Sequence, residues 1–505
     1  MKAPVILYLL TLGFGVSTYA VVEVYDYPDV IVRGDLGEHS RSKLFKVTLS
    51  QGGNDYSPYV MYDRNQEPHG NLALNPDNHW TNFSFSGAIT IRITRLDGQD
   101  FEWCRALPSA KGFHVDLDGA KAIIRIPEQV NPLQLFIEMN DMKRDALLIF
   151  ADPLETDASD GASEDTAVIS PGESIDSVIE KMTGDKTTVV FEKGIHRWGD
   201  KTGNDYAGYK LPIVSGKRIY IPGGAYVVGT FSGLNQSDWK LYGRGVISAC
   251  GLERIPQIAG IPFSMVHADG VEAEGQVIEG IVSICPPHFN ITVRGEVFID
   301  NVKMLSWWHQ TDGTVTGNNS VVRNCFFKVC DDVIKIYSDN CIHDNNTIFH
   351  QVNGAPFQFS WGGQHGDHNV STNTYIVNSI YKPQKEFSNS AVINAMGGRP
   401  GNVTENNRWD GIFIDNGCHR LIGLNAKGGT HRDFEIKNVV LNSGTNVRPQ
   451  ENFSYLTNGD YSNIRFYNLV VDGERIGGTN PEEDLPGKGL LWFRNENLSA
   501  VSFSK

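Results

Sequence analysis

Short runs of alternating apolar and polar residues fill the first third of the chain. Examples are VVEVYDYPDVIV, LFKVTLS, AITIRITRL and KAIIRIPE. A period of two residues with polar turns between the runs is typical of strands that bury one face. The pattern predicts an antiparallel β-sandwich over residues 21–155, which ends near the apolar segment DALLIFADP.

A small, acidic segment without a hydrophobic period, LETDASDGASEDTA, follows the predicted sandwich. Such composition favours a linker or surface loop, which we assign to residues 156–170. The next stretch, SPGESIDSVIEKMTG, predicts one short helix. Ser170 is the expected N-cap, and Pro171 suits the first turn.

From residue 171 the pattern changes to short V/I/F-rich strands separated by Gly, Asn or Asp. RIYIPGGAYVVGTFSG and EVFIDNVKMLSWW are two of these segments. They recur roughly every 20 to 25 residues, which predicts a right-handed parallel β-helix over residues 171–475. A large sandwich or propeller is the alternative, but no repeat of equal blade length is present. Residues 476–505 are expected to form a terminal strand and tail, so the fold class is all-β.

Composition and charge narrow the class of partners. The chain has 505 residues, of which 40% are hydrophobic and 20% charged, so it can bury a large core. Its net charge is −15, and we find no cluster of Lys or Arg. Nucleic acid and anionic membranes need basic patches, so neither is an expected partner. We also expect a monomer.

The N-terminus predicts an extracellular protein. Residues 1–20 combine Lys2, an apolar stretch and a small-residue cleavage site, as a secretory signal peptide does. No later stretch is long and apolar enough to cross a bilayer. Asn-X-Ser/Thr sequences for glycosylation occur at Asn82, Asn235, Asn290, Asn318, Asn345, Asn369, Asn402, Asn452 and Asn497. The seven cysteines lack the spacing of metal ligands and predict buried thiols with one or two disulfides.

Three aspartates stand out by their spacing. Asp312 lies in WWHQTDG, and nineteen residues later Asp331 begins the pair Asp331–Asp332 in CDDV. Nineteen residues is close to one coil, and neighbouring strands lie about 4.8 Å apart. Asp312 and Asp331 are therefore expected on adjacent coils, with Asp332 beside them. Carboxylates so close cannot all ionise easily, which raises at least one pKa and suits general acid catalysis.

The expected reaction is an inverting glycoside hydrolysis. Asp331 is assigned as the acid that protonates the leaving oxygen, and Asp312 and Asp332 as the groups that activate water. Inverting enzymes hold acid and base roughly 6.5 to 9.5 Å apart. Two other interpretations remain open: a solvated turn without chemistry, and a calcium site of the kind that pectate lyases use, for which Lys335 is the nearby basic residue.

The segment HQTDG…VCDDVIKIY resembles the catalytic core of glycoside hydrolase family 49, the dextranases and isopullulanases. The resemblance extends to DALLIFADPLE, IPGGAYVVGTFSG and APFQFSWGG. It implies a β-sandwich followed by a β-helix, and a neutral α-glucan with α-1,6 or pullulan-type linkages as substrate. It implies the same three catalytic aspartates and neither a cofactor nor a metal. The residues it implies for substrate binding are Gln310, Lys335, Tyr337, Trp361 and Trp308.

Two further functions remain open from the sequence. One is a non-catalytic carbohydrate-binding or extracellular matrix protein on the same scaffold. The other is a polygalacturonase-like hydrolase, since those enzymes share the Thr-Asp-Gly motif and a following Asp pair. They carry Asn and Gly where Gln310 and Cys330 stand here, and their Arg-Ile-Lys motif is absent.

Overall fold

In a computed structural model of the protein, nearly every element is a strand, which confirms the all-β fold class. The predicted signal peptide lies outside the described residues, apart from Ala20. The described residues are 20–34, 37–65, 77–128, 130–140, 146–198, 210–250, 264–306, 310–351, 353–379, 389, 391–418, 420–442, 454–476, 493–494 and 498–504.

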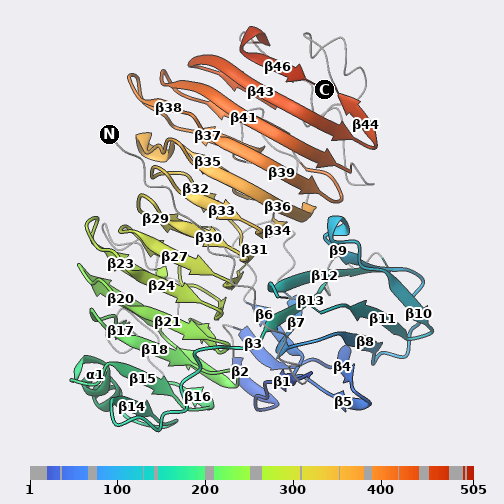
Figure 1. The fold of residues 1–505 in the computed structure, drawn as a ribbon, viewed down its shortest axis with the longest axis vertical. Coiled ribbons are helices and arrows are strands. Elements are labelled where there is room, and N and C mark those ends of the chain that lie inside the picture. Colours follow the sequence, from blue (N-terminus) through green and yellow to red (C-terminus); the bar gives the residue numbers. More distant parts are fainter. Residues whose placement is uncertain are drawn as a thin grey trace, which may run out of the picture.

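The N-terminal part is a β-sandwich of two sheets, drawn in blue and cyan in Figure 1. The first sheet contains β1 (Val22–Val24), β2 (Val30–Gly34), β3 (Gly37–Arg41), β6 (Met61–Asn65), β7 (Asp77–Phe85), β13 (Ala146–Pro153), β12 (Leu133–Met139) and β9 (Cys104–Leu107). The second contains β10 (Val115–Asp118), β11 (Lys121–Ile126), β8 (Ile89–Arg95), β4 (Phe45–Gln51) and β5 (Asn54–Tyr56). A short 3₁₀ helix, η1 (Ser109–Lys111), follows β9.

Strand β13 departs from the predicted antiparallel arrangement, because it pairs with β7 in parallel. Its apolar run is continuous rather than alternating because both of its faces are covered. Leu147 and Ile149 pack in the sandwich core, while Leu148 and Phe150 face a second cluster shared with the β-helix. Buried parallel strands have this continuous pattern.

The rest of the chain winds into the predicted right-handed parallel β-helix, which rises beside the sandwich in Figure 1. Most coils contribute two strands to a 22-stranded sheet and one to an 11-stranded sheet. Register shows the coil length: Phe298 pairs with Val321, and Thr314 pairs with Ile334.

The larger sheet contains β14 (Thr166–Ile169), β15 (Thr188–Phe191), β16 (Gly194–His196), β18 (Arg218–Ile221), β19 (Ala225–Val228), β21 (Lys240–Gly243), β22 (Val246–Ser248), β24 (Gln276–Glu279), β25 (Val282–Ile284), β27 (Val297–Asp300), β28 (Lys303–Leu305), β30 (Val321–Arg323), β31 (Phe326–Lys328), β33 (Ile342–Asp344), β34 (Thr347–His350), β36 (Val370–Ser379), β38 (Val403–Glu405), β39 (Arg408–Ile414), β41 (Thr430–Leu441), β43 (Asp460–Val471), β44 (Glu474–Ile476) and β46 (Val501–Ser504). The smaller sheet contains β17 (Lys210–Pro212), β20 (Thr230–Leu234), β23 (Ser264–Asp269), β26 (Phe289–Val293), β29 (Thr314–Thr316), β32 (Ile334–Lys335), β35 (Phe357–Phe359), β37 (Ala391–Met396), β40 (Arg420–Asn425), β42 (Ser454–Thr457) and β45 (Phe493–Arg494).

Both ends of the β-helix differ from the predicted boundaries. Strand β14 begins the large sheet inside the segment 156–170 that was expected to be a linker. The acidic composition of that segment has a structural use, since Asp157 pairs with Arg218 and Lys240 of the β-helix. At the other end, β45 and β46 pair with the preceding coils, so the described residues 493–494 and 501–504 of the segment expected to hold a terminal strand and tail continue the β-helix.

Helix α1 (Ile175–Thr183) lies at the first coil and begins later than expected. Its N-cap is Ser174, whose hydroxyl accepts a hydrogen bond from the Ser177 N–H at 3.3 Å, and not Ser170. Val178 and Met182 are its buried residues and join the β-helix core. This apolar face covers strand edges that would otherwise be open.

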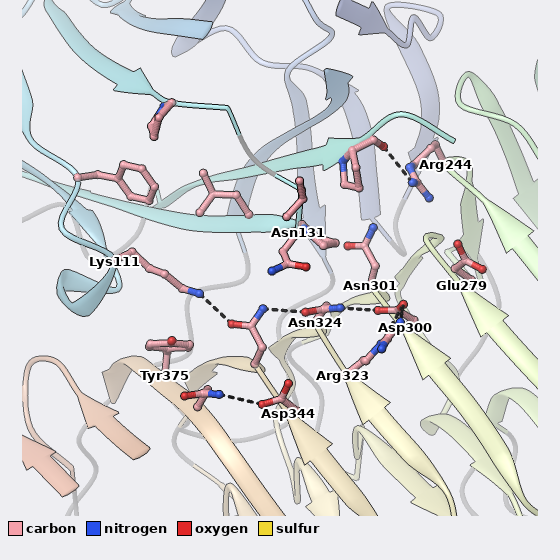
Figure 2. Close-up of a pocket in the computed structure, with 18 residues that line it drawn as sticks. Lys111, Asn131, Arg244, Glu279, Asp300, Asn301, Arg323, Asn324, Asp344 and Tyr375 are labelled. Atoms are coloured by element: carbon pink, nitrogen blue, oxygen red, sulfur yellow. Dashed lines mark hydrogen bonds and ion pairs between the residues drawn. The ribbon is translucent and has the colours of Figure 1, made fainter. Parts of the chain in front are cut away.

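Asparagines in the left-handed conformation turn the chain between the two strands that several coils contribute to the large sheet. Asn301, Asn324 and Asn345 occupy this corner in three successive coils, with φ between 52° and 57°. Asn tolerates this region better than other residues with a side chain. The Asn345 amide donates to Asn324 at 2.7 Å, and the Asn324 amide donates to Asp300 at 2.7 Å (Figure 2). This stacked ladder accounts for the abundance of asparagine in the β-helix sequence.

The ladder lines a crevice of about 640 Å³ between the sandwich and the β-helix, shown in Figure 2. Lys111 of the sandwich donates to Asn345 across it at 2.8 Å. None of the predicted site residues lines this crevice. Deeper in the junction, Lys303 and Asp152 form a fully buried ion pair of 2.6 Å. The junction thus joins the two parts through buried apolar, hydrogen-bonded and ionic contacts.

Two sequence expectations concern single residue types. All seven cysteines are among the described residues and none forms a disulfide, in contrast to the one or two predicted. Asn82, Asn290 and Asn369 are at most 3% exposed, so the folded protein cannot carry glycans there.

In the described part of the chain, no helix has the length and apolar character needed to span a bilayer.

Candidate active site

The three predicted aspartates converge at the ends of two neighbouring coils. Asp312 is separated from β29 by Gly313 alone, and the pair Asp331–Asp332 is separated from β32 by Val333 alone. Each of the three residues has a carboxylate oxygen that lies within 4.8 Å of a carboxylate oxygen of the other two. Asp312 and Asp332 are buried, whereas Asp331 is partly exposed.

The register differs by one residue from the expectation. Because Thr314 pairs with Ile334, twenty residues separate equivalent positions, and Asp332 rather than Asp331 lies opposite Asp312. The backbone confirms this alignment, since the Gly313 N–H donates to the Asp332 carbonyl at 2.8 Å. Asp331 therefore occupies a different environment from the other two carboxylates.

Lys335 binds the two buried carboxylates together. Its ammonium nitrogen lies 2.5 Å from Oδ2 of Asp312 and 2.9 Å from Oδ2 of Asp332. Burial opposes the charge on Lys335, but Asp312 and Asp332 raise its pKa well above the usual value. Burial raises the pKa of Asp312 well above its ordinary range, with a further contribution from Asp331 and Asp332, although Lys335 opposes this shift.

Asp331 receives neutral donors instead of the ammonium. Its Oδ2 accepts hydrogen bonds from the Gln310 backbone N–H and the Asn353 amide, both at 2.9 Å. Its Oδ1 accepts the Asp332 N–H at 3.0 Å. Burial and the adjacent Asp332 charge raise the pKa of Asp331 to about 7. A carboxyl group with this pKa can hold a proton near neutral pH and donate it.

Two glycines allow the close approach of the coils. A Cβ on Gly313 would lie 2.2 Å from the Val333 carbonyl oxygen. A Cβ on Gly354 would lie 1.9 Å from the Asp331 carbonyl carbon, and Gly354 also has φ of +83°. The backbone that presents Asp331 and Asp332 is thus fixed from the next coil.

A cleft of about 570 Å³ lies over the small sheet, and Lys335 connects it to the aspartates, since Lys335 lines the cleft and binds Asp312 and Asp332. Lys335, Tyr337 and Trp361, three of the predicted substrate-binding residues, line it, and Phe289 and Gln364 are additional lining residues. Trp361 is 39% exposed, so its ring is available to a ligand. Apolar ring faces with polar groups around them suit a sugar.

The remaining predicted residues have different outcomes. Gln310 reaches the cluster through its backbone N–H. Trp308 lies outside the described residues, as do Trp307 and His309. Sequence reasoning missed Asn353 and Asn389, whose amide donates to Oδ1 of Asp332 at 2.7 Å. Asn389 is 57 residues from Asp332 along the chain and has no motif around it that could have identified it.

Known proteins resemble this chain over most of its length, although no family model matches it. A dextranase from Arthrobacter sp. (strain CB-8) is 25% identical over 513 residues, covering 83% of this chain and 77% of the relative. An isopullulanase from Aspergillus niger is 22% identical over 66% of this chain and 62% of its own length. The fold of Dex49A from Penicillium minioluteum superposes with a TM-score of 0.78 at 18% identity, covering 95% and 96% of the two chains.

Fold and relatives together define the class of the protein, a glycoside hydrolase built on a parallel β-helix. They support membership of glycoside hydrolase family 49, which confirms the resemblance identified in the sequence.

Proposed function

We propose that the protein is a secreted hydrolase of a neutral α-glucan with α-1,6 or pullulan-type linkages, acting as a monomer and with inversion. The observation that carries the proposal is the convergence of Asp312, Asp331 and Asp332 around Lys335 at one end of the cleft. The dextranase and isopullulanase relatives support an α-glucan substrate.

Asp331 acts as the general acid in this proposal. It is the carboxyl group that Lys335 does not bind within salt-bridge distance, and its pKa of about 7 keeps a proton available. Oδ2 already accepts two N–H groups, whereas Oδ1 accepts one, so the proton belongs on Oδ1. Transfer of this proton to the glycosidic oxygen lets the leaving sugar depart as an alcohol.

Asp312 and Asp332 hold and deprotonate the attacking water. The ammonium of Lys335 opposes the effect of burial on the pKa of Asp312, and each carboxylate oxygen keeps a lone pair beyond the one that faces Lys335. Both oxygens of Asp332 accept N–H donors, from Lys335 and Asn389, which reduces its nucleophilicity. This arrangement favours a base that acts through water over a carboxylate that attacks the sugar directly.

The carboxylate spacing differs from the sequence expectation. Oxygens of the three groups approach within 4.8 Å, whereas inverting enzymes usually hold acid and base roughly 6.5 to 9.5 Å apart. The usual range describes carboxyl groups on opposite sides of a sugar, but these three come from adjacent coils at one end of the cleft. The proposal of inversion therefore rests on the donors around Asp332, and product stereochemistry must test it.

The charges in the cleft favour a neutral glycan over a uronate. Lys335 is paired with two aspartates, and Arg294, which also lines the cleft, lies 3.5 Å from Asp269. Lys335 also occupies the position between Asp312 and Asp332 that a bound calcium ion would take. These contacts weigh against the polygalacturonase-like and lyase alternatives.

The test is an assay of new reducing ends with dextran, pullulan and polygalacturonate, comparing wild type with Asp331→Asn. We expect release of reducing ends from an α-glucan, and we expect the substitution to slow this release about 10²- to 10⁴-fold. Absence of release from every α-glucan, with an intact fold, would contradict the proposal and favour a carbohydrate-binding protein.

A further inference from the structure

A second cluster of chemically reactive side chains lies at the junction of the sandwich and the β-helix. Its residues are not among those that line the cleft. His39 is on β3 of the sandwich, Cys250 follows β22, and Cys285 follows β25. Strands β22 and β25 pair in parallel with Ser248 opposite Ile284, so the two cysteines lie at the same corner of consecutive coils. All three side chains are buried, and their ligand atoms lie within 4.8 Å of one another.

We propose that His39, Cys250 and Cys285 form a site for a thiophilic divalent metal ion, of which Zn²⁺ is the best match. Imidazole and thiolate are the ligands that zinc prefers, whereas calcium and magnesium prefer oxygen. The site would connect the sandwich to two coils of the β-helix, independently of the reaction in the cleft.

The observed spacing fits tetrahedral coordination. Zinc bonds of about 2.3 Å to sulfur and about 2.1 Å to nitrogen, at a tetrahedral angle, separate the two ligand atoms by about 3.5 Å. Sγ of Cys285 and Nε2 of His39 are 3.3 Å apart.

The surrounding hydrogen bonds prepare His39 as a ligand. Nδ1 of His39 lies 2.5 Å from the Tyr226 hydroxyl, and that hydroxyl donates to Ser248 at 2.9 Å. Because the tyrosine proton is used toward Ser248, Nδ1–H is the donor to the tyrosine oxygen. Nε2 then carries the lone pair and faces Cys285. Metal-binding histidines are commonly oriented in this way by a hydrogen bond to the other ring nitrogen.

The cysteine positions add a second indication. Cys285 has a φ of +53°, a conformation that residues with a side chain rarely adopt. Strained positions of this kind concentrate at functional sites. The Ser248 hydroxyl oxygen accepts hydrogen bonds from the Tyr226 hydroxyl at 2.9 Å and from the Cys250 N–H at 3.0 Å, so one residue positions both the partner of His39 and the backbone of Cys250.

The experiment measures metal content on the full secreted chain. Protein purified without chelator and dialysed with a small excess of Zn²⁺ is analysed by mass spectrometry of the elements. We expect one equivalent of zinc in the wild type, loss in Cys250→Ser and Cys285→Ser, and retention in Cys104→Ser as the matched control. Cobalt substitution should give thiolate-to-cobalt charge-transfer absorption.

Two measurements keep the test informative if the cysteine variants do not fold. Tyr226→Phe keeps every ligand but removes the hydroxyl, so it should weaken zinc affinity about 10- to 100-fold. Thiol titration of the wild type in denaturant with chelator should find all seven cysteines reduced. Five reactive thiols with a Cys250–Cys285 disulfide, or seven thiols without bound zinc, would overturn the proposal.

Discussion

The ammonium nitrogen of Lys335 lies 2.5 Å from Oδ2 of Asp312, and both side chains are buried. The same ammonium reaches Asp332 at 2.9 Å. The ammonium of Lys335 thus forms ion pairs with two carboxylates. The carboxyl group of Asp331 lies beside them and is not within ion-pair distance of Lys335. This inequality gives Asp331 only neutral donors and gives Asp312 and Asp332 a shared cation, which is the difference in environment that separate acid and base roles require.

Replacing the proposed acid should remove most activity without removing binding. Asp331→Asn keeps the shape and the N–H contacts but cannot donate the proton, so kcat should fall about 10²- to 10⁴-fold with little change in KM. Steady-state kinetics on the preferred glucan measures this. A variant with kcat close to wild type would exclude Asp331 as the acid.

The pH dependence of kcat/KM should report the protonation of Asp331. The acid must be protonated, and the pKa of Asp331 is raised to about 7, so kcat/KM should fall as pH rises through about 7. The base must be ionised, so activity should also fall at low pH. In Asp331→Asn the residual activity should lose the alkaline decline, and its persistence would assign that decline to another group.

Removing the shared cation should affect both stability and the pH profile. Lys335→Met leaves Asp312 and Asp332 buried without their counter-ion, which should lower the free energy of unfolding by about 3–5 kcal/mol. Protonation relieves the cost, so the acid limb of kcat/KM should move to higher pH. Lys240→Met is the control, since it breaks a partly exposed ion pair and should cost about 1 kcal/mol or less. Urea unfolding at pH 7 compares the two, and equal losses would contradict this assignment.

Gly354 should be required for the position of the Asp331–Asp332 backbone. In Gly354→Ala the new Cβ would meet the Asp331 carbonyl carbon at 1.9 Å, so the Asp331–Asp332 backbone must move. A displacement near 1 Å can lower kcat by about 10²-fold. Gly362→Ala is matched because it also has positive φ, of +64°, but nothing lies within 4 Å of its new Cβ. Similar kcat values for the two variants would show that the contact with Asp331 is unimportant.

The exposed ring of Trp361 should contribute to binding rather than to the chemical step. Trp361→Ala should raise KM roughly tenfold through loss of about 1.4 kcal/mol of stacking, with kcat nearly unchanged. Trp361→Phe should keep most of the affinity. Leu234→Ala, at another exposed apolar side chain outside the cleft lining, is the control. A large fall in kcat would instead place Trp361 in the catalytic step.

Much of the fold follows from the sequence because the two parts have different hydrophobic periods. Alternation over the sandwich and the coil-length repeat after it each correspond to one way of burying apolar side chains. The boundaries were less predictable. The acidic segment 156–170 has no hydrophobic period, and it is the pairing of β14 with β15 and the contacts of Asp157 with Arg218 and Lys240 that show it packs on the β-helix.

The candidate active site was likewise only partly predictable from the sequence. The spacing of the aspartates predicted their convergence, but a coil of 20 residues instead of 19 placed Asp332, not Asp331, opposite Asp312. Coil length depends on the corner residues and cannot be read to one position from a repeat. Asn389 contacts Asp332 from 57 residues away, and His39 meets Cys285 from 246 residues away. Contacts of that kind come from the winding of the chain and not from a local motif.

The most direct test of the central claim is the configuration of the first product. Proton NMR can follow the anomer released from the most rapidly hydrolysed α-glucan before mutarotation mixes the two forms. Two aspartates that activate water, with Asp331 as the acid, predict the β-anomer from an α-linkage, and Asp331→Asn should slow its release about 10²- to 10⁴-fold. Initial release of the α-anomer would show retention through a covalent intermediate and would contradict the assignment of Asp312 and Asp332 as bases.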